Sequence, residues 1–245
     1  MIFIPPGTFL GGFFIRLFGN TFCIYEYMVY FIQRLKFVEN RRKKHNEGLS
    51  NEAISVLCSN YIVPEYVIMP GIAAGTKNIT DSGTQEFGDV LLANAVWNYS
   101  NGKYVSPHQA EIVFGEIGFN PRPTMVKIAG EHLTEIQKYL RSGRSEFYVH
   151  SGPLASGTAV VANTSIIKKQ INSSFKDTEG VEMEGYGVAY AVSHALNPKP
   201  HTIIAKSVCD FADERKNDIY QKFAAYTSCG FIKELLENVL TYTGE

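Results

Sequence analysis

The stretch that most constrains the fold is residues 181–195, where an acidic pair separates an extended pattern from a helical one. Side chains alternate along a strand, so Glu182 and Glu184 are expected to share one side. The apolar Val181 and Met183 then face the other side. The apolar residues that follow fall at helical spacing: Val188, Ala189, Ala191, Val192 and Ala195. Polar residues where a strand gives way to a helix commonly bind ligands in α/β proteins, so the stretch predicts a site; two solvated turn acids are the alternative.

Apolar runs and helical patterns alternate along the rest of the chain. Short apolar runs predict strands at residues 65–69, 88–93, 147–150 and 201–208. Helical spacing and capping residues predict helices at residues 51–58, 131–140, 163–171 and 218–240. Asn101 and Gly102 predict the turn of a β-hairpin. We therefore predict an α/β fold: a single domain with a central mixed β-sheet flanked by helices.

Small or polar residues collect at the ends of the predicted strands. They form four clusters, at Gly71–Gly75, Gly157–Val161, Glu182–Glu184 and Asp210. Strand ends meet at one edge of an α/β sheet, so the clusters predict one site there. The glycine-containing loop lets a ligand approach the backbone closely, although a tight structural turn needs the same residues.

Composition narrows the class of protein. A chain of 245 residues with 45% apolar content suits one domain with a full core, and its net charge of -1 gives no indication of a nucleic-acid partner. The four cysteines and six histidines are scattered without metal-ligand spacing, which predicts no metal site and reduced thiols in the cytoplasm. The aromatic-rich residues 1–33 lack an apolar run of about 18 residues, which argues against a membrane span.

Five segments, taken in this order, resemble one known family. They are Val67–Gly75, Gly88–Val90, Ser156–Val161, Val181–Glu184 and Lys206–Asp213. Together they resemble the nucleoside phosphorylase superfamily, specifically its methylthioadenosine/S-adenosylhomocysteine nucleosidase-like branch. The resemblance covers about three quarters of the chain, from residue 64 to residue 240. It implies a nucleosidase that hydrolyses the N-glycosidic bond of an adenosine-type nucleoside and releases the base.

The resemblance also implies residue roles. Asp210 matches the general acid that gives a proton to the leaving purine, and burial at a strand end favours the protonated acid. Glu184 matches the residue that binds the ribose hydroxyls, with Met183 packed on the sugar and Glu182 assisting or supporting its neighbour. A turn cap is the alternative role for Asp210.

Four further residues match the base-binding side of the family pattern. Val160 falls where the family often places an aromatic ring against the base, and the Val161 backbone would pair with the purine edge. Ile72 and Ala73 belong to the glycine-containing loop, and Ile72 replaces the serine usual in this branch. For the two valines, a role as strand core is the alternative.

The N-terminal part departs from the family. Residues 1–60 carry no recognisable Gly-rich first strand with its water-positioning glutamate, and Glu26 and Glu39, the only acids before Glu47, do not match its context. Residues 1–50 are predicted to be a diverged or truncated first part of the fold, with the domain at residues 51–245. A phosphorolytic enzyme and a catalytically degenerate purine-binding or regulatory protein are therefore the alternatives. The resemblance implies a small purine nucleoside as partner, no cofactor, no membrane and a homodimer.

Overall fold

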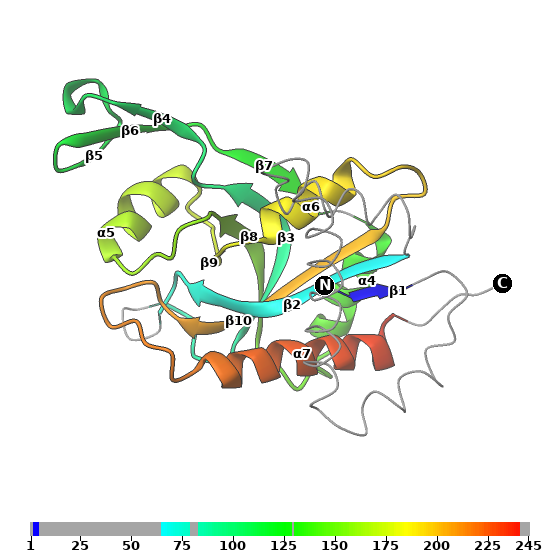
Figure 1. Cartoon of the computed structure of the whole chain (residues 1–245). Helices are drawn as coiled ribbons and strands as arrows, with labels where there is room; N and C mark the ends of the chain where they lie inside the picture. Colours follow the sequence, from blue (N-terminus) through cyan, green and yellow to red (C-terminus); the bar gives the residue numbers. More distant parts are fainter. Residues whose placement is uncertain (1, 5–64, 79–82, 129, 241–245) are drawn as a thin grey trace, which may run out of the picture.

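The computed structural model describes residues 2–4, 65–78, 83–128 and 130–240. The helix predicted at residues 51–58 lies outside them, as does nearly all of the N-terminal segment predicted for residues 1–50. A mixed sheet with helices packed against it confirms the predicted α/β class (Figure 1). No helix in the part of the chain that the structure describes is long and apolar enough to cross a bilayer.

The main sheet has seven strands in the order β1-β2-β10-β3-β8-β9, with β7 beside β3. Their bounds are Ile2–Ile4 (β1), Tyr66–Gly75 (β2), Val90–Asn98 (β3), Thr124–Lys127 (β7), Val149–Ser156 (β8), Gly180–Glu182 (β9) and His201–Asp210 (β10). β2 and β10 are parallel, and so are β3 and β8, whereas β10 and β3 are antiparallel. Because β9 pairs with β2 as well as β8, five of the strands close into a ring.

The register of this ring brings two predicted clusters to one place. Ala74, near the end of β2, pairs with Asp210 on one side and with Val181 of β9 on the other. Neighbouring strands lie roughly 4.8 Å apart, so the Cα atoms of Asp210 and Val181 are about 10 Å apart. The aspartate and the acidic pair therefore lie at the same edge of the sheet.

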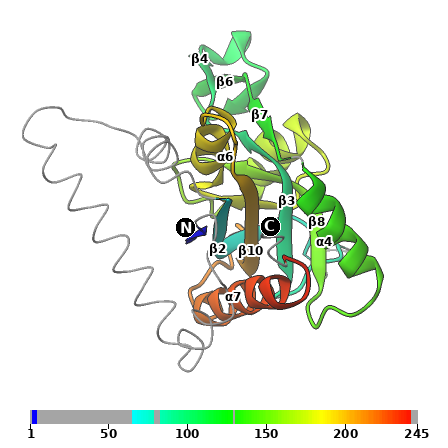
Figure 2. The ribbon, with the colours of Figure 1, turned by 90° about the vertical axis from the view of Figure 1, so that its right-hand side faces the viewer.

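The helices cover the strands from several sides. α7 (Gln221–Asn238) packs along β2 and β10, and α6 (Gly185–Ser193) contacts β3, β7 and β8. Figures 1 and 2 show the strands lying between these two helices. α4 (Glu131–Arg141) contributes Leu133, Ile136 and Tyr139 to the main core. β10 is buried at every position after its first, and the buried positions include the polar Thr202, Lys206, Ser207 and Asp210 as well as its apolar residues.

The helix predicted at residues 163–171 consists of two parts. α5 (Thr164–Ile166) continues into a π-helix (Ile167–Asn172). Of the two residues predicted as possible caps, Asn163 and Thr164, the cap is Asn163, whose side chain accepts a hydrogen bond from the Ser165 N–H at 2.9 Å. This cap fixes the start of the helix directly after the loop that carries Val160 and Val161.

A separate three-stranded sheet projects from the body of the molecule (Figure 1). It comprises β4 (Gly102–Val105), β5 (Ile112–Phe114) and β6 (Ile117–Pro121), with the 3-10 helix η2 (Pro107–Gln109) between β4 and β5. The predicted hairpin at Asn101 and Gly102 is therefore wrong, since β4 pairs with β6 and not with β3. The end of β3 already has β7 on one side and β8 on the other, so its edges are occupied.

Two strands extend beyond their predicted ends, through segments that were predicted as loops. β2 continues to Gly75 because β10 pairs with it up to Ala74, and β8 continues to Ser156 because β3 pairs with it throughout. Pro70 lies inside β2, between Ile68, which pairs with β1, and Ala74, which pairs with β9. No described strand pairs with this edge of β2 between those two residues, so the missing N–H of the proline is tolerated there.

Candidate active site

One hydrophobic cluster joins the four predicted strand-end segments. Ala74, Val161, Val181 and Ala212 each come from a different segment and pack in this cluster, together with Trp97, Tyr99, Ala155, Ile167 and Ile171. The cluster is separate from the main core beneath the helices. Apolar packing thus holds the glycine-containing strand end, the loop after β8, β9 and the turn after β10 against one another.

Asp210 ends β10 and is buried. Its Oδ1 accepts the N–H of Ala212 at 2.8 Å, while its Oδ2 accepts from the Cys209 thiol at 3.3 Å and forms an ion pair with Lys216. Burial, followed by the nearby Asp210 charge, raises the pKa of Cys209 to about 12, so this thiol is a neutral donor. Ala212 adopts a left-handed backbone conformation (φ 52°), which costs a residue with a Cβ roughly 1 kcal/mol. The turn therefore carries strain where it meets the carboxylate.

A pocket of about 480 Å³ opens beside Asp210. It lies between the segment that follows β2 and the segment between β10 and α7. Its apolar wall is aromatic, and Phe87 stacks on Tyr220 with ring centroids 4.0 Å apart. The lining residues are Asn78, Gln85, Glu86, Phe87, Asp210, Phe211, Asp213, Arg215, Lys216, Asn217, Tyr220 and Phe223. Aromatic faces beside a buried carboxylate and an ammonium suit a flat, polar, heterocyclic ligand.

Glu182 is buried and caps α6. Its carboxylate accepts the N–H of Glu184 at 3.0 Å and that of Gly185 at 2.8 Å, and it also accepts from the Ser156 hydroxyl. Ser156 Oγ in turn accepts the N–H of Tyr186 at 2.8 Å. A carboxylate at a helix N-terminus satisfies donors that have no partner within the helix. Glu182 therefore holds the backbone at Glu184 and at the start of α6, and its role at the ribose hydroxyls stays a prediction.

Glu184 is half exposed and is held by a buried lysine. Lys206 Nζ lies 3.5 Å from Glu184 Oε2 and 3.4 Å from Glu182 Oε2, and only 4% of the lysine side chain is exposed. A Cβ on Gly71 would approach Lys206 Nζ to 2.9 Å, so glycine makes room for the ammonium. Glu184 thus presents a fixed carboxylate to solvent, which is a geometry suited to accepting hydrogen bonds from hydroxyl groups.

The other predicted site residues differ in how far their side chains are exposed to solvent. Met183 and Val160 are exposed, with 43% and 63% of their surface accessible, and each can contact a ligand. Val161 and Ala73 are buried in the two hydrophobic clusters, so their side chains serve as core. Ile72 is half buried in β2. Of all the predicted site residues, Asp210 is the one that lines the pocket.

Sequence reasoning missed two lysines. Lys206 carried a signal, because a lysine inside the apolar run of a predicted strand must be buried with a partner. Lys216 carried none, because a lysine in a charged loop is ordinarily solvated. Within the described ranges, no three or more His, Cys, Asp or Glu side chains lie where they could together hold a metal ion.

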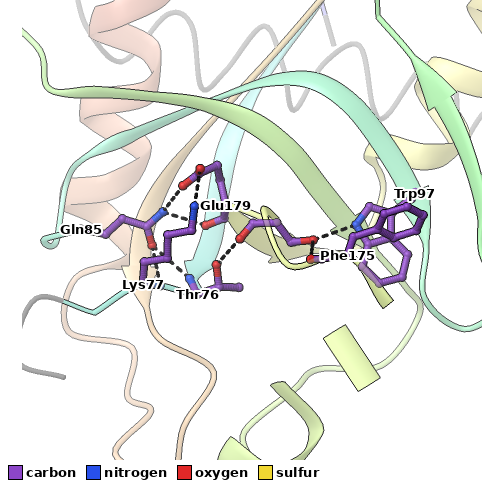
Figure 3. Close-up of polar contacts among 7 residues, drawn as sticks. Thr76, Lys77, Gln85, Trp97, Phe175 and Glu179 are labelled. Atoms are coloured by element: carbon purple, nitrogen blue, oxygen red, sulfur yellow. Dashed lines mark hydrogen bonds and ion pairs between the residues drawn. The ribbon is translucent and has the colours of Figure 1, made fainter. Parts of the chain in front are cut away.

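A buried polar network joins the end of β2 to the start of β9 (Figure 3). Gln85 Oε1 accepts the N–H groups of Thr76 and Lys77, each at 3.0 Å. Gln85 Nε2 donates to the backbone carbonyl and to the carboxylate of Glu179, at 2.8 and 3.0 Å. Lys77 Nζ completes the network with an ion pair to Glu179 at 2.6 Å. The Gln85 side chain thus makes four hydrogen bonds, and two of them hold Glu179, which lies shortly before the acidic pair in the chain.

A second set of bonds continues the network toward the hydrophobic cluster (Figure 3). Thr76 Oγ1 donates to the Thr178 carbonyl at 2.5 Å. The Thr178 hydroxyl accepts from Trp97 Nε1 at 3.1 Å and donates to the Phe175 carbonyl at 2.7 Å. The segment before β9 is therefore fixed by side chains from β3 and by the turn that follows β2.

Replacing Gln85 with alanine is expected to lower the free energy of unfolding by about 3 kcal/mol, because buried backbone and carboxylate groups lose their partners. Denaturant unfolding of the variant and the wild type measures the change. The matched control is Gln109→Ala, in which the side chain is exposed and its loss is expected to change stability little. A Gln85→Ala change no larger than that of the control would show that the network does not stabilise the fold.

Comparison with solved structures identifies the fold. A 5′-methylthioadenosine/S-adenosylhomocysteine nucleosidase from Neisseria meningitidis, in complex with methylthio-immucillin-A, superposes with a TM-score of 0.59 at 19% identity, over 77% of this chain and 76% of that chain. The chain has the nucleoside phosphorylase fold. A futalosine hydrolase mutant of Helicobacter pylori is similar, with a TM-score of 0.59 at 18% identity over 77% of this chain and 75% of that chain. This nucleosidase-like fold confirms the predicted architecture.

Sequence comparison gives a more limited result. No family model matches the chain. The uncharacterized protein y4jS of Sinorhizobium fredii (strain NBRC 101917 / NGR234) is 32% identical over 182 residues, which are 67% of this chain and 41% of the relative. The chain thus spans less than half the length of this curated relative. Because the relative is uncharacterized, a proposal for the function has to rest on the nucleosidase-like fold and on the geometry of the site.

Proposed function

We propose that the chain is a purine nucleosidase, which uses water to cleave the bond between a purine base and ribose. The observation that carries this proposal is the buried Asp210 carboxylate beside an aromatic-walled pocket, at the same sheet edge as the fixed Glu184 carboxylate. The likeness of the fold to nucleosidases supports the same reaction class.

The base end of the reaction requires a proton. When the C1′–N9 bond breaks, its electron pair goes to the purine, and a proton delivered to N7 neutralises the base. The oxygen of water bonds to C1′, and the proton that this water loses restores the donor. Of the three carboxylates that line the pocket, those of Glu86, Asp210 and Asp213, only Asp210 is buried. With its partner Lys216 it forms a pair suited to hold and deliver that proton.

The sugar end requires acceptors for hydroxyl groups. The ribosyl centre becomes cationic as the bond breaks, and a carboxylate at its hydroxyls stabilises that charge. Glu184 is suited to this task because Glu182 caps its helix and Lys206 holds its carboxylate. Exposed Met183 beside it offers an apolar surface for the sugar. Glu26 and Glu39, neither of which matches the context of the family's water-positioning glutamate, lie outside the described residues.

Base release without phosphate is the expected result when purified protein is incubated with methylthioadenosine, adenosine, inosine and guanosine. Chromatography of the free base, with and without added inorganic phosphate, measures it. The panel includes the adenosine-type substrate that the sequence resemblance implies.

The same assay distinguishes the alternatives. Release that requires phosphate would replace hydrolysis by phosphorolysis. No release from any nucleoside, combined with tight binding of a free purine, would overturn the enzymatic proposal in favour of a purine-binding protein. A heat-inactivated sample is the control for spontaneous cleavage.

A further inference from the structure

The ammonium of Lys216, rather than a free carboxylate, faces the pocket at the end of β10. The Asp210 side chain is 4% exposed, whereas that of Lys216 is 24% exposed and lines the same pocket. Both oxygens of Asp210 are already in use, Oδ1 by the Ala212 N–H and Oδ2 by Lys216 and the Cys209 thiol. A base that approaches Asp210 therefore meets the Lys216 ammonium before the carboxylate.

The loop that carries Lys216 is held in place by its own bonds. The Lys216 N–H donates to the Asp213 carbonyl at 3.1 Å, and the Asp213 carboxylate binds Arg215. Glu214 accepts from the Thr164 N–H at 3.1 Å and from its hydroxyl at 2.7 Å, which ties the loop to the start of α5. These contacts hold the three residues before the lysine, so the backbone that carries Lys216 has a fixed position in the fold.

An ammonium discriminates between purines by the group at position 6. It has three N–H donors and no acceptor, and one donor is used by Asp210. A 6-oxopurine offers two acceptors on one edge, N7 and O6, whereas a 6-aminopurine offers N7 beside an N–H donor. With a 6-oxopurine both remaining donors can be satisfied. With a 6-aminopurine, two donors face each other at position 6 and neither is satisfied.

We propose that Lys216 determines the base specificity of this site and selects 6-oxopurine nucleosides, such as inosine and guanosine, over adenosine-type nucleosides. This inference rests on the proposed function, and it departs from the adenosine-type substrate that the sequence resemblance implies. An unpaired buried donor weakens binding or the transition state by about 10- to 100-fold, which sets the expected preference. Asp210 without its lysine would instead accept from a 6-amino group.

The test compares kcat/KM for inosine and adenosine in the wild type, Lys216→Met, Lys216→Arg and the control Lys222→Met. Lys222 is exposed at the start of α7 and does not line the pocket. The wild type is expected to prefer inosine by about 10- to 100-fold. Lys216→Met is expected to lower that ratio at least tenfold, whereas the arginine variant, which retains the donors, and the control keep the preference.

Calorimetric binding of hypoxanthine and adenine provides a readout that does not depend on turnover. The wild type is expected to bind hypoxanthine more tightly, and Lys216→Met to lose that difference. If no nucleoside is cleaved but hypoxanthine is preferred, the proposed function fails while the role of Lys216 stands. Equal binding of both bases, or an inosine preference that Lys216→Met leaves unchanged, would overturn the role of Lys216.

Discussion

Replacing Asp210 with asparagine is expected to lower kcat/KM for nucleoside cleavage by about 100- to 10,000-fold, the range typical of a lost acid–base group. The asparagine side chain has the same shape and can still accept the Ala212 N–H, so the turn after β10 is expected to persist. It cannot hold a proton, and it does not balance the charge of Lys216. Steady-state kinetics on the best substrate of the nucleoside panel measures the loss.

The control for this variant is Asp177→Asn. Asp177 is exposed in the segment before β9 and does not line the pocket, so activity is expected to remain within twofold of the wild type, roughly the scatter of surface substitutions. Circular dichroism and the unfolding midpoint of Asp210→Asn establish that the fold is intact. An intact Asp210→Asn variant with near-normal turnover would show that Asp210 is not part of the acid–base machinery.

The sequence was sufficient for the parts of the fold that depend on local pattern. Apolar β-branched runs marked β10 and the first half of β2, and helical spacing marked α4 and α7, because these signals depend on neighbours along the chain. The sequence was insufficient where the bounds or pairing of a strand depend on neighbouring strands that are distant in the chain. β2 and β8 continue through glycine and proline because adjacent strands pair with them, and β4 leaves its predicted hairpin because β3 has no free edge.

For the candidate site too, the sequence located the segments but not the partners that their side chains contact. Motif order located Asp210 and the acidic pair, and the register about Ala74 brings those segments to one sheet edge. The two lysines that hold these carboxylates could not be paired from the sequence, because Lys206 and Lys216 reach their partners across strands or around a turn. The missing information was therefore which charges neutralise the predicted acids, and those charges decide what a ligand meets.

Replacing Lys206 with methionine is expected to lower the free energy of unfolding by about 3 to 5 kcal/mol. Methionine nearly matches the volume of the lysine stem, so the change removes charge and little packing. It leaves Glu182 with 1% of its side chain exposed and no cation, although its bonds to Ser156 and to the start of α6 remain. An uncompensated buried charge is costly even when hydrogen-bonded. Denaturant unfolding measures the loss.

A surface pair supplies the matched control. Lys138 binds Glu135 at 2.7 Å, a shorter contact than either made by Lys206, but both of these side chains are more than half exposed. Lys138→Met is therefore expected to change stability by less than about 0.5 kcal/mol. Burial, rather than distance, would then account for the difference between the two variants.

A double variant separates the ion pair from other effects of the substitution. Adding Glu182→Gln to Lys206→Met removes the unpaired charge, so the double variant is expected to be more stable than Lys206→Met alone. Because Lys206 also holds Glu184, Lys206→Met and the double variant are both expected to raise KM for the nucleoside. Equal stability of the single and double variants, with KM unchanged, would contradict the view that this buried lysine positions the acidic pair.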